Sequence, residues 1–291
     1  MTTRSYTVQF FQAESFTLDE AQKEDHLFQL FATEAERQAR DKVSILTATA
    51  SGYHCELREL TVFPGVVQGC LGLLRPDAPH IREVNGAERV IEVDPGERFL
   101  EKNYFLYFKQ GRIIAWQYNL AANHITNLGL ILGALTGGEH AVSCHVLLDD
   151  DFAFDPNAEI HLVDLRVRSP KTRAQQEDVA RLNPNQWGVN PFQVMTDTSS
   201  KSLALVLTTG RDRGNMGGPV KTMIRELLNS TQTRRLRVKM GDAQEPIDLL
   251  ARRVKRRVEI EMNGMYPNPA SAWQQLQVAK DDANDEIQRC I

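Results

Sequence analysis

The sequence has few cysteines and no apolar run long enough to cross a membrane. Its longest strongly apolar stretch, LGLILGAL at 128–135, is far shorter than the roughly 20 residues that a transmembrane helix needs. The four cysteines are scattered without a CxxC pair, which disfavours a zinc ribbon or a disulfide framework and is typical of reduced thiols. The first residues also lack the basic, apolar and small-residue order of a signal peptide. We therefore expect a cytoplasmic protein that does not insert into a membrane.

Catalytic signatures are missing as well. The sequence has no GxSxG nucleophile elbow and no HExxH zinc motif, and its glycine-rich stretch GRDRGNMGGP at 210–219 does not match the Walker pattern GxxxxGK[ST]. It also has no helix-turn-helix, zinc-finger or RNA-recognition motif. We therefore expect a protein that is not an enzyme, uses no cofactor and no metal, and does not recognise a nucleotide sequence.

An acidic run leaves a metal-dependent nuclease as an alternative. The stretch DDDFAFD at 149–155 offers carboxylates of the kind that bind Mg²⁺. The residues that such a site would use are Asp149, Asp150, Asp151 and Asp164. A restriction-type nuclease also needs an acid-x-lysine pair on a strand, and the nearest candidates, DLR at 164–166 and EIE at 259–261, lack the lysine. A polar turn is the simpler interpretation of the aspartates.

Strand patterns and helix patterns are mixed along the chain. Two runs rich in aromatic and β-branched residues flank 110–111 and predict a hairpin. Apolar residues at helical spacing predict a helix over 18–38, and a proline in the first turn predicts helices that begin near Pro219 and Pro269. Because strand-only stretches and helices alternate irregularly, the predicted fold class is α+β, with mixed or antiparallel sheets and packed helices.

The length and the patterning predict two domains. With 291 residues, the chain is long enough for one large domain or two smaller ones. We expect an N-terminal α+β domain at 1–139 and a C-terminal α+β domain at 140–291, each with its own sheet. The C-terminal domain is expected to carry a basic face.

The charge is distributed unevenly. Residues 201–257 contain fourteen Lys or Arg against five Asp or Glu, a formal charge of +9, so in a chain of net charge −4 the remainder carries −13. Such a division indicates a basic surface on an otherwise acidic body, or two parts that neutralise each other across an internal interface. Composition alone favours neither.

Two runs concentrate the positive charge. RRLRVKM at 234–240 alternates, so a strand would present Arg235, Arg237 and Lys239 on one face. LARRVKRRVEIEMNG at 250–264 packs five basic residues into six positions and then becomes acidic. We expect a helix that begins at Pro246 and a strand that follows it from about residue 256.

The simplest interpretation of these runs is a solvated sheet face, on which Glu259 and Glu261 pair with Arg237 or Lys239. That face still leaves its other outward positions basic. Because neighbouring like charges repel, the pattern favours a negatively charged partner. The partner is a nucleic acid or, in a protein-interaction module, an acidic protein or the acidic half of a dimer mate.

The glycine-rich stretch at 210–219 extends the basic surface. It carries Arg211 and Arg213 and leads into a predicted helix that bears Lys221. Exposed N–H groups at the start of a helix bind anions, which leaves phosphate as a possible ligand. A flexible strand-to-helix turn is the simpler interpretation of the glycines taken alone.

Together these cations predict a nucleic-acid interface. They would follow the phosphates of double-stranded DNA, so binding would be independent of sequence and would weaken strongly with salt. The predicted residues are Arg211, Arg213, Lys221, Arg234, Arg235, Arg237, Lys239, Arg253, Lys255, Arg256 and Arg257.

The chain contains, in this order, NYFLYFKQGRIIAW with LGLILGAL after it, SLALVLTTGRDR leading into VKTMIRELL, RRLRVKM with GDAQEPIDLL, and ASAWQQLQVAKDDANDEI. This order of elements resembles that of the RexA-like phage-exclusion proteins and, more distantly, that of the KwaB-type antiphage defence proteins. The resemblance covers most of the chain in element order, whereas the glycines at 214–218 and the basic run at 252–257 have no counterpart in it.

The resemblance implies a cytoplasmic homodimer that binds double-stranded DNA without sequence preference. It also implies a role in defence against phage, by exclusion or abortive infection, in which the protein signals to a partner effector. The interface residues come from the charge pattern alone.

Overall fold

The computed structural model describes most of the chain. The described residues are 2–15, 20–41, 46–49, 53–75, 80–82, 86, 88–91, 94, 97–119, 121–137, 141–148, 159–170, 179, 190–209, 215–230, 232–241 and 245–290. They form two compact units, the first made of 1–144 with 257–280 and the second of 145–256 with 281–291. The predicted boundary between 139 and 140 divides the chain once, whereas residues 257–280 return to the first unit. Each unit combines antiparallel strands with helices, which confirms the predicted α+β class.

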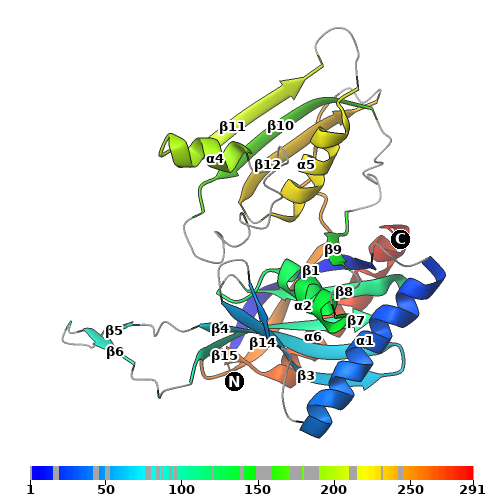
Figure 1. Cartoon of the computed structure of the whole chain (residues 1–291), viewed down its shortest axis with the longest axis vertical. Coiled ribbons are helices and arrows are strands. Elements are labelled where there is room, and N and C mark those ends of the chain that lie inside the picture. Colours follow the sequence, from blue (N-terminus) through cyan, green and yellow to red (C-terminus); the bar gives the residue numbers. More distant parts are fainter. Residues whose placement is uncertain are drawn as a thin grey trace. The chain divides into compact units, whose positions relative to one another are not determined.

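The first unit is built on one large sheet (Figure 1), which has nine strands among the described residues. In sheet order these are β15 (Tyr266–Pro267), β14 (Lys255–Asn263), β1 (Thr3–Ser15), β8 (Ile113–Tyr118), β7 (Phe99–Phe108), β4 (Val66–Arg75), β3 (His54–Phe63) and β2 (Leu46–Ala48), while β9 (Val142–Val146) pairs with β1 off this path. The pairs from β1 through to β2 are all antiparallel. A separate hairpin joins β5 (His80–Arg82) to β6 (Glu88–Val90).

Helices cover both faces of the large sheet. On one face, Phe31 of α1 (Glu20–Asp41) packs on Phe105 and Tyr107 of β7, with ring centroids 5.7 and 5.0 Å apart. On the other face, Trp273 of α6 (Pro269–Asp282) meets Tyr104 edge to face at 5.6 Å. Because successive side chains of a strand point to opposite faces, this alternation places α1 and α6 on opposite sides of β7. The central strand is therefore buried on both faces.

Several sequence predictions for the first unit are confirmed. The hairpin predicted at 110–111 is β7, a short 3-10 turn (Gln110–Arg112) and β8, with Phe108 opposite Ile113. Gly111 has a φ of 72°, a backbone conformation that glycine adopts without strain. The helix predicted over 18–38 is α1, and the helix predicted near Pro269 is α6. The stretch LGLILGAL lies in α2 (Ile125–Leu135).

The second unit has a smaller antiparallel sheet, with two of its helices packed on one face. Its strands are, in sheet order, β11 (Ser202–Thr208), β10 (Ile160–Arg168), β12 (Thr233–Met240) and β13 (Ile247–Asp248). Its helices are α4 (Asn190–Asp197), α5 (Gly218–Asn229) and α7 (Asn284–Cys290). Leu165 and Val163 of the sheet share one buried core with Phe192 of α4 and Met223 of α5. Both α4 and α5 therefore cover the same sheet face (Figure 1), which leaves the outer face without a helix among the described residues.

One helix prediction in this unit is wrong. The helix expected to begin at Pro246 is instead the short strand β13 followed by turns, and β14 then starts at Lys255. Leu249 from these turns is buried in the core of the unit, so tertiary packing outweighs the helical spacing of the apolar residues. The helix predicted near Pro219 is confirmed as α5, with that proline in its first turn.

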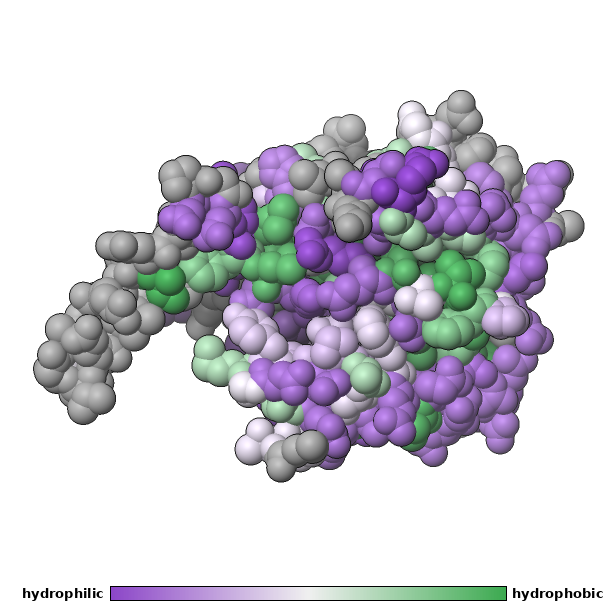
Figure 2. Space-filling view, turned by 90° about the horizontal axis from the view of Figure 1, so that it is seen from below, coloured by the Kyte–Doolittle hydropathy of each residue, from purple (hydrophilic) through white to green (hydrophobic). Residues whose placement is uncertain are grey.

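One face of the molecule is mainly polar. Figure 2 shows a face on which hydrophilic residues predominate and apolar residues form separate patches. The exposed large apolar side chains include Val206 on β11, which is 59% exposed. In the described part of the chain, no helix is long and apolar enough to span a membrane.

Candidate nucleic-acid interface

The outer face of the four-stranded sheet gathers the basic side chains. Along β10, Val163, Leu165 and Val167 are buried in the core, so Arg166 and Arg168 point to the opposite, outer face. Both arginines are exposed. The antiparallel registers extend this outer face from β10 over β11 and β12.

A register shift brings two consecutive arginines of β12 to this face. Arg235 lies opposite Arg166, but Thr233 lies opposite Val167, so Arg234 is an extra residue in β12. With regular alternation, Arg234 would point into the core like Leu236. The structure instead has Arg234 exposed and Arg235 half-buried. An extra residue of this kind is a β-bulge, which redirects a side chain locally.

These residues enclose a pocket at one end of the sheet. It has a volume of about 410 Å³ and is formed by the end of β10 and the starts of β11 and β12. Its lining residues are Arg166, Val167, Arg168, Lys201, Ser202, Arg234 and Arg235. Five of these carry a positive charge and none is acidic. We call this the basic pocket.

Acidic side chains compensate only part of the outer face. Asp164 lies 3.4 Å from the guanidinium of Arg235, and Asp248 lies 3.8 Å from that of Arg237. All four side chains are partly exposed, so these pairs stabilise the fold weakly. The other cations of the pocket form no ion pair with a described residue. These are Arg166, Arg168, Lys201 and Arg234.

The predicted cations of the C-terminal part are distributed over different elements. Arg237 and Lys239 lie on the outer face of β12 beyond the pocket. Lys221 lies on α5, which covers the core side of the sheet. Arg211 and Arg213 lie outside the described residues.

The second basic run belongs to the large sheet. Lys255, Arg256 and Arg257 open β14. Arg256 donates hydrogen bonds from Nε to Asp282, at 2.9 Å, and from Nη2 to Glu286, at 2.7 Å. The hydrogen bond with Glu286 is the main reason that the pKa of Arg256 is raised above its ordinary value. Arg256 therefore fastens the start of β14 to the C-terminal helices.

The structure also accounts for Arg253 and for the two glutamates of this run. The guanidinium of Arg253 donates a hydrogen bond to the backbone carbonyl of Leu228. The alternative in which Glu259 and Glu261 pair with cations of β12 across one sheet is wrong, because β14 and β12 lie in different sheets. The carboxylate beside Arg237 is that of Asp248.

Sequence reasoning missed three cations of the basic pocket. Arg166 and Arg168 are two residues apart on β10, and this spacing places them on one face of the strand. Lys201 precedes β11, and its carbonyl accepts a hydrogen bond from the backbone N–H of Ser169 at 3.0 Å. The missing information was the pairing of β10 with both β11 and β12, which joins residues far apart in the chain.

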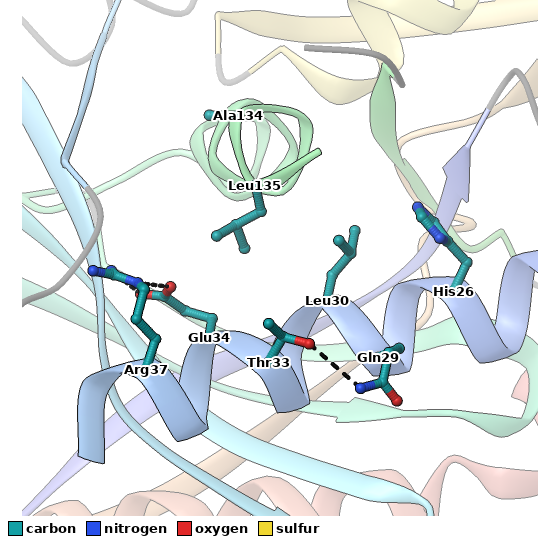
Figure 3. A pocket seen from close by; sticks show the side chains of 8 residues that line it. All are labelled: His26, Gln29, Leu30, Thr33, Glu34, Arg37, Ala134 and Leu135. Atoms are coloured by element: carbon teal, nitrogen blue, oxygen red, sulfur yellow. Dashed lines mark hydrogen bonds and ion pairs between the residues drawn. The ribbon is translucent and has the colours of Figure 1, made fainter. Parts of the chain in front are cut away.

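A second pocket differs from the basic pocket because its positive and negative side chains are paired. It has a volume of about 370 Å³ and lies between α1 and α2 in the first unit. Figure 3 shows Arg37 and Glu34 directed toward each other, and Glu34 is only 1% exposed. The guanidinium of Arg37 donates two hydrogen bonds of 2.7 Å to this carboxylate, while Gln29 donates one to Thr33. The charged pair Arg37–Glu34 and the polar pair Gln29–Thr33 thus bind within this pocket.

The described residues give the nuclease alternative little support. Asp149, Asp150 and Asp151 lie outside the described residues. Asp164 accepts a hydrogen bond from Arg235 on the outer face of the sheet. In the ranges that the structure describes, no three His, Cys, Asp or Glu side chains gather in a way that would hold a metal ion.

The basic pocket gathers side chains whose chemistry suits anions. Guanidinium groups stay protonated at neutral pH and donate paired hydrogen bonds to phosphate or carboxylate oxygens. Five cations in one hollow repel each other until an anion enters. No protein-family model matches the chain, and searches of curated proteins and of solved structures found no match either. The site therefore has to be interpreted from its own chemistry.

Proposed function

We propose that the chain is a non-specific double-stranded DNA-binding protein of a bacterial antiphage system, acting in phage exclusion or abortive infection. It contacts phosphates through the outer face of the four-stranded sheet, with the basic pocket at one end of this face and Arg237 and Lys239 beyond it. The observation that carries the proposal is the pocket whose described lining residues include five cations and no acid. Arginines in such numbers are typical of surfaces that bind phosphate.

The chemistry of this face favours phosphate contacts over base contacts. The cations come from paired strands of one sheet, and the described residues of this face include no helix that could enter a groove. Phosphate contacts position a protein on a duplex without selecting a sequence. Binding is therefore the same for unrelated sequences, and each contact releases counterions, which makes the affinity depend steeply on salt.

The biological part of the proposal draws on the resemblance to RexA-like and KwaB-type proteins. We infer from this resemblance that the protein acts as a cytoplasmic homodimer that senses DNA and signals to a partner effector. A dimer would place two basic pockets on one duplex and increase the avidity of binding. Size-exclusion chromatography with light scattering, with and without DNA, measures the oligomeric state.

Fluorescence anisotropy tests the DNA binding. The protein is titrated into two unrelated labelled duplexes of about 30 base pairs at several salt concentrations, and the logarithm of the affinity is plotted against the logarithm of the salt concentration. We expect equal affinities for the two duplexes and a slope of about −0.9 for each phosphate contacted. A clear preference for one duplex, or no binding at low salt, would refute non-specific phosphate binding.

A protein-interaction module is the second candidate. It is favoured by Val206, which is 59% exposed on the outer face of the sheet, two strands away from Arg235. Apolar residues within a charged surface are typical of protein interfaces. If an acidic protein binds this face, duplex DNA must fail to displace it. Plasmid cleavage that requires Mg²⁺ or Mn²⁺ and is lost in Asp164→Ala would instead support the nuclease alternative.

A further inference from the structure

The basic pocket differs from the rest of the outer sheet face in shape and in charge. Outside it, the cation Arg237 lies near the carboxylate of Asp248. Within it, five cations surround a hollow of about 410 Å³, no described lining residue is acidic, and among the described residues only Arg235 of the five forms an ion pair, with Asp164. A flat face with scattered cations is sufficient for the backbone of a duplex, whose phosphodiesters each carry one negative charge. A concave group of five cations suits a smaller ligand of higher charge density.

We propose that the basic pocket binds a phosphate monoester, the group that ends a 5′-phosphorylated strand and that a mononucleotide also carries. For the source of this group, the inference rests on the proposed function. If the protein binds DNA, the phosphate monoester is the one at a DNA end. A bound monoester carries about −1.5 to −2 charges at neutral pH and has three strong acceptor oxygens. An internal phosphodiester offers one charge and two such oxygens.

The arrangement of donors matches that group. Arg168 lies on the central strand, with Ser202 opposite it on β11. Arg166 lies two residues earlier on the same face, opposite Arg235 on β12. Donors therefore converge from three adjacent strands. Three oxygens can each accept more than one hydrogen bond, and forked guanidinium groups supply those bonds in pairs.

The bulge in β12 supports a binding site because it directs Arg234 into the pocket. Without the extra residue, regular alternation would turn Arg234 toward the core, where an arginine would be buried against Leu236 and Val238. The bulge places Arg234 in the pocket beside Arg235. Bulges occur frequently next to binding sites, where they direct a side chain toward the ligand.

The volume indicates that more than the phosphate enters. A pocket of about 410 Å³ lies in the range of small-molecule sites, roughly 300–1,000 Å³, and exceeds what one phosphate group fills. The terminal nucleotide can therefore enter with its phosphate, whereas the inner phosphates of a continuous duplex reach the arginines of the pocket only at its rim. Covalently closed DNA is expected to make these rim contacts and those of the rest of the outer face without filling the pocket.

The test compares two labelled DNA hairpins that differ only in their single end, which bears either a 5′-phosphate or a 5′-hydroxyl group. Affinities are measured by anisotropy for the wild type, for the pocket variant Arg168→Gln/Arg234→Gln and for the control variant Arg98→Gln/Arg289→Gln. The control removes the same charge from exposed positions outside the interface. A second arm measures the thermal shift caused by dAMP and by deoxyadenosine.

We expect the wild type and the control variant to bind the phosphorylated hairpin about tenfold more tightly, and the pocket variant to bind both hairpins alike. Two results together would identify a free nucleotide as the source. The two hairpins would bind with equal affinity, and dAMP, but not deoxyadenosine, would stabilise the wild type while failing to stabilise the pocket variant.

Two results separate the inference from the proposed function. If both hairpins bind with one affinity and dAMP does not stabilise the protein, DNA binding stands and the monoester site is refuted. If neither hairpin binds, the proposed function fails, and the dAMP arm alone decides whether the pocket takes a phosphate monoester.

Discussion

The two arginine-rich runs look alike in the sequence but differ in the structure. The run at 234–240 forms β12, where Arg234 and Arg235 open into the basic pocket. The run at 252–257 leads into β14, where Arg256 is bound by Asp282 and Glu286. A cluster of basic residues thus lines a pocket in one place and fastens elements of the fold in the other. The difference lies in where the topology supplies carboxylates.

The largest expected effect follows from reversing charge in the basic pocket. Arg168→Glu/Arg234→Glu replaces two donors with groups that repel phosphate, so the affinity for a duplex falls by about a hundredfold or more. Anisotropy at a fixed salt concentration measures this loss. The free energy of unfolding should not fall, because the substitution removes repulsion among five cations. A variant that keeps wild-type affinity would show that these arginines do not contact DNA.

The next largest effect is on stability and arises in the other run. Arg256→Gln removes hydrogen bonds to two carboxylates from a side chain that is only 23% exposed, so the free energy of unfolding falls by about 1–3 kcal/mol. The raised pKa of Arg256 means that its contribution is fully present at neutral pH and is lost only as pH rises through that raised value. Urea denaturation of the variant, with Arg257→Gln as the neighbouring exposed control, measures the change.

The affinity of Arg256→Gln for DNA should stay close to that of the wild type in a folded preparation. A large loss of affinity at unchanged stability would contradict the division between the two runs, because it would make Arg256 a ligand-binding residue.

A smaller effect is expected for the exposed cations of β14. Lys255→Gln/Arg257→Gln removes two positive charges outside the basic pocket, so only the general field of the protein changes, and the affinity falls by about threefold or less. The same anisotropy titration measures this value. A loss equal to that of the pocket variant would extend the interface to β14.

The smallest effect concerns the first unit, which the pocket substitutions should leave unchanged. Burial raises the pKa of Cys70 and of Cys144 to about 12, so both thiols are protonated at pH 8 and react poorly. We expect iodoacetamide to leave both unmodified in the wild type and in the pocket variant until denaturant is added, as mass spectrometry would show. Labelling of the pocket variant alone would mean that the substitutions disturb more than the basic pocket.

Local patterns predicted much of the fold. The aromatic runs around residue 110 predicted the hairpin of β7 and β8, and prolines marked the starts of α5 and α6. The helix expected from Pro246 is wrong because Leu249 is buried by contacts with distant residues. The pairing of β14 with the N-terminal strands also depends on distant contacts, which no local pattern contains.

The candidate site was predictable only in part. Alternation correctly placed Arg235 and Arg237 on one face of β12. It gave no indication of the bulge that exposes Arg234, nor of Arg166 and Arg168, because these depend on which strands pair and in which register. In the sequence, Arg256 cannot be distinguished from the other predicted interface cations, because its partners Asp282 and Glu286 come from helices much later in the chain.

The most direct test of the account is the salt dependence of DNA binding in the wild type and in Arg168→Gln/Arg234→Gln. If the basic pocket contacts phosphate, the variant binds unrelated duplexes more weakly, and the slope of log affinity against log salt becomes shallower by about 1.8, the value for two lost contacts. The unfolding free energy of the variant should equal or exceed that of the wild type. An unchanged slope and affinity in a folded variant would contradict the claim that the uncompensated cations of this pocket bind DNA.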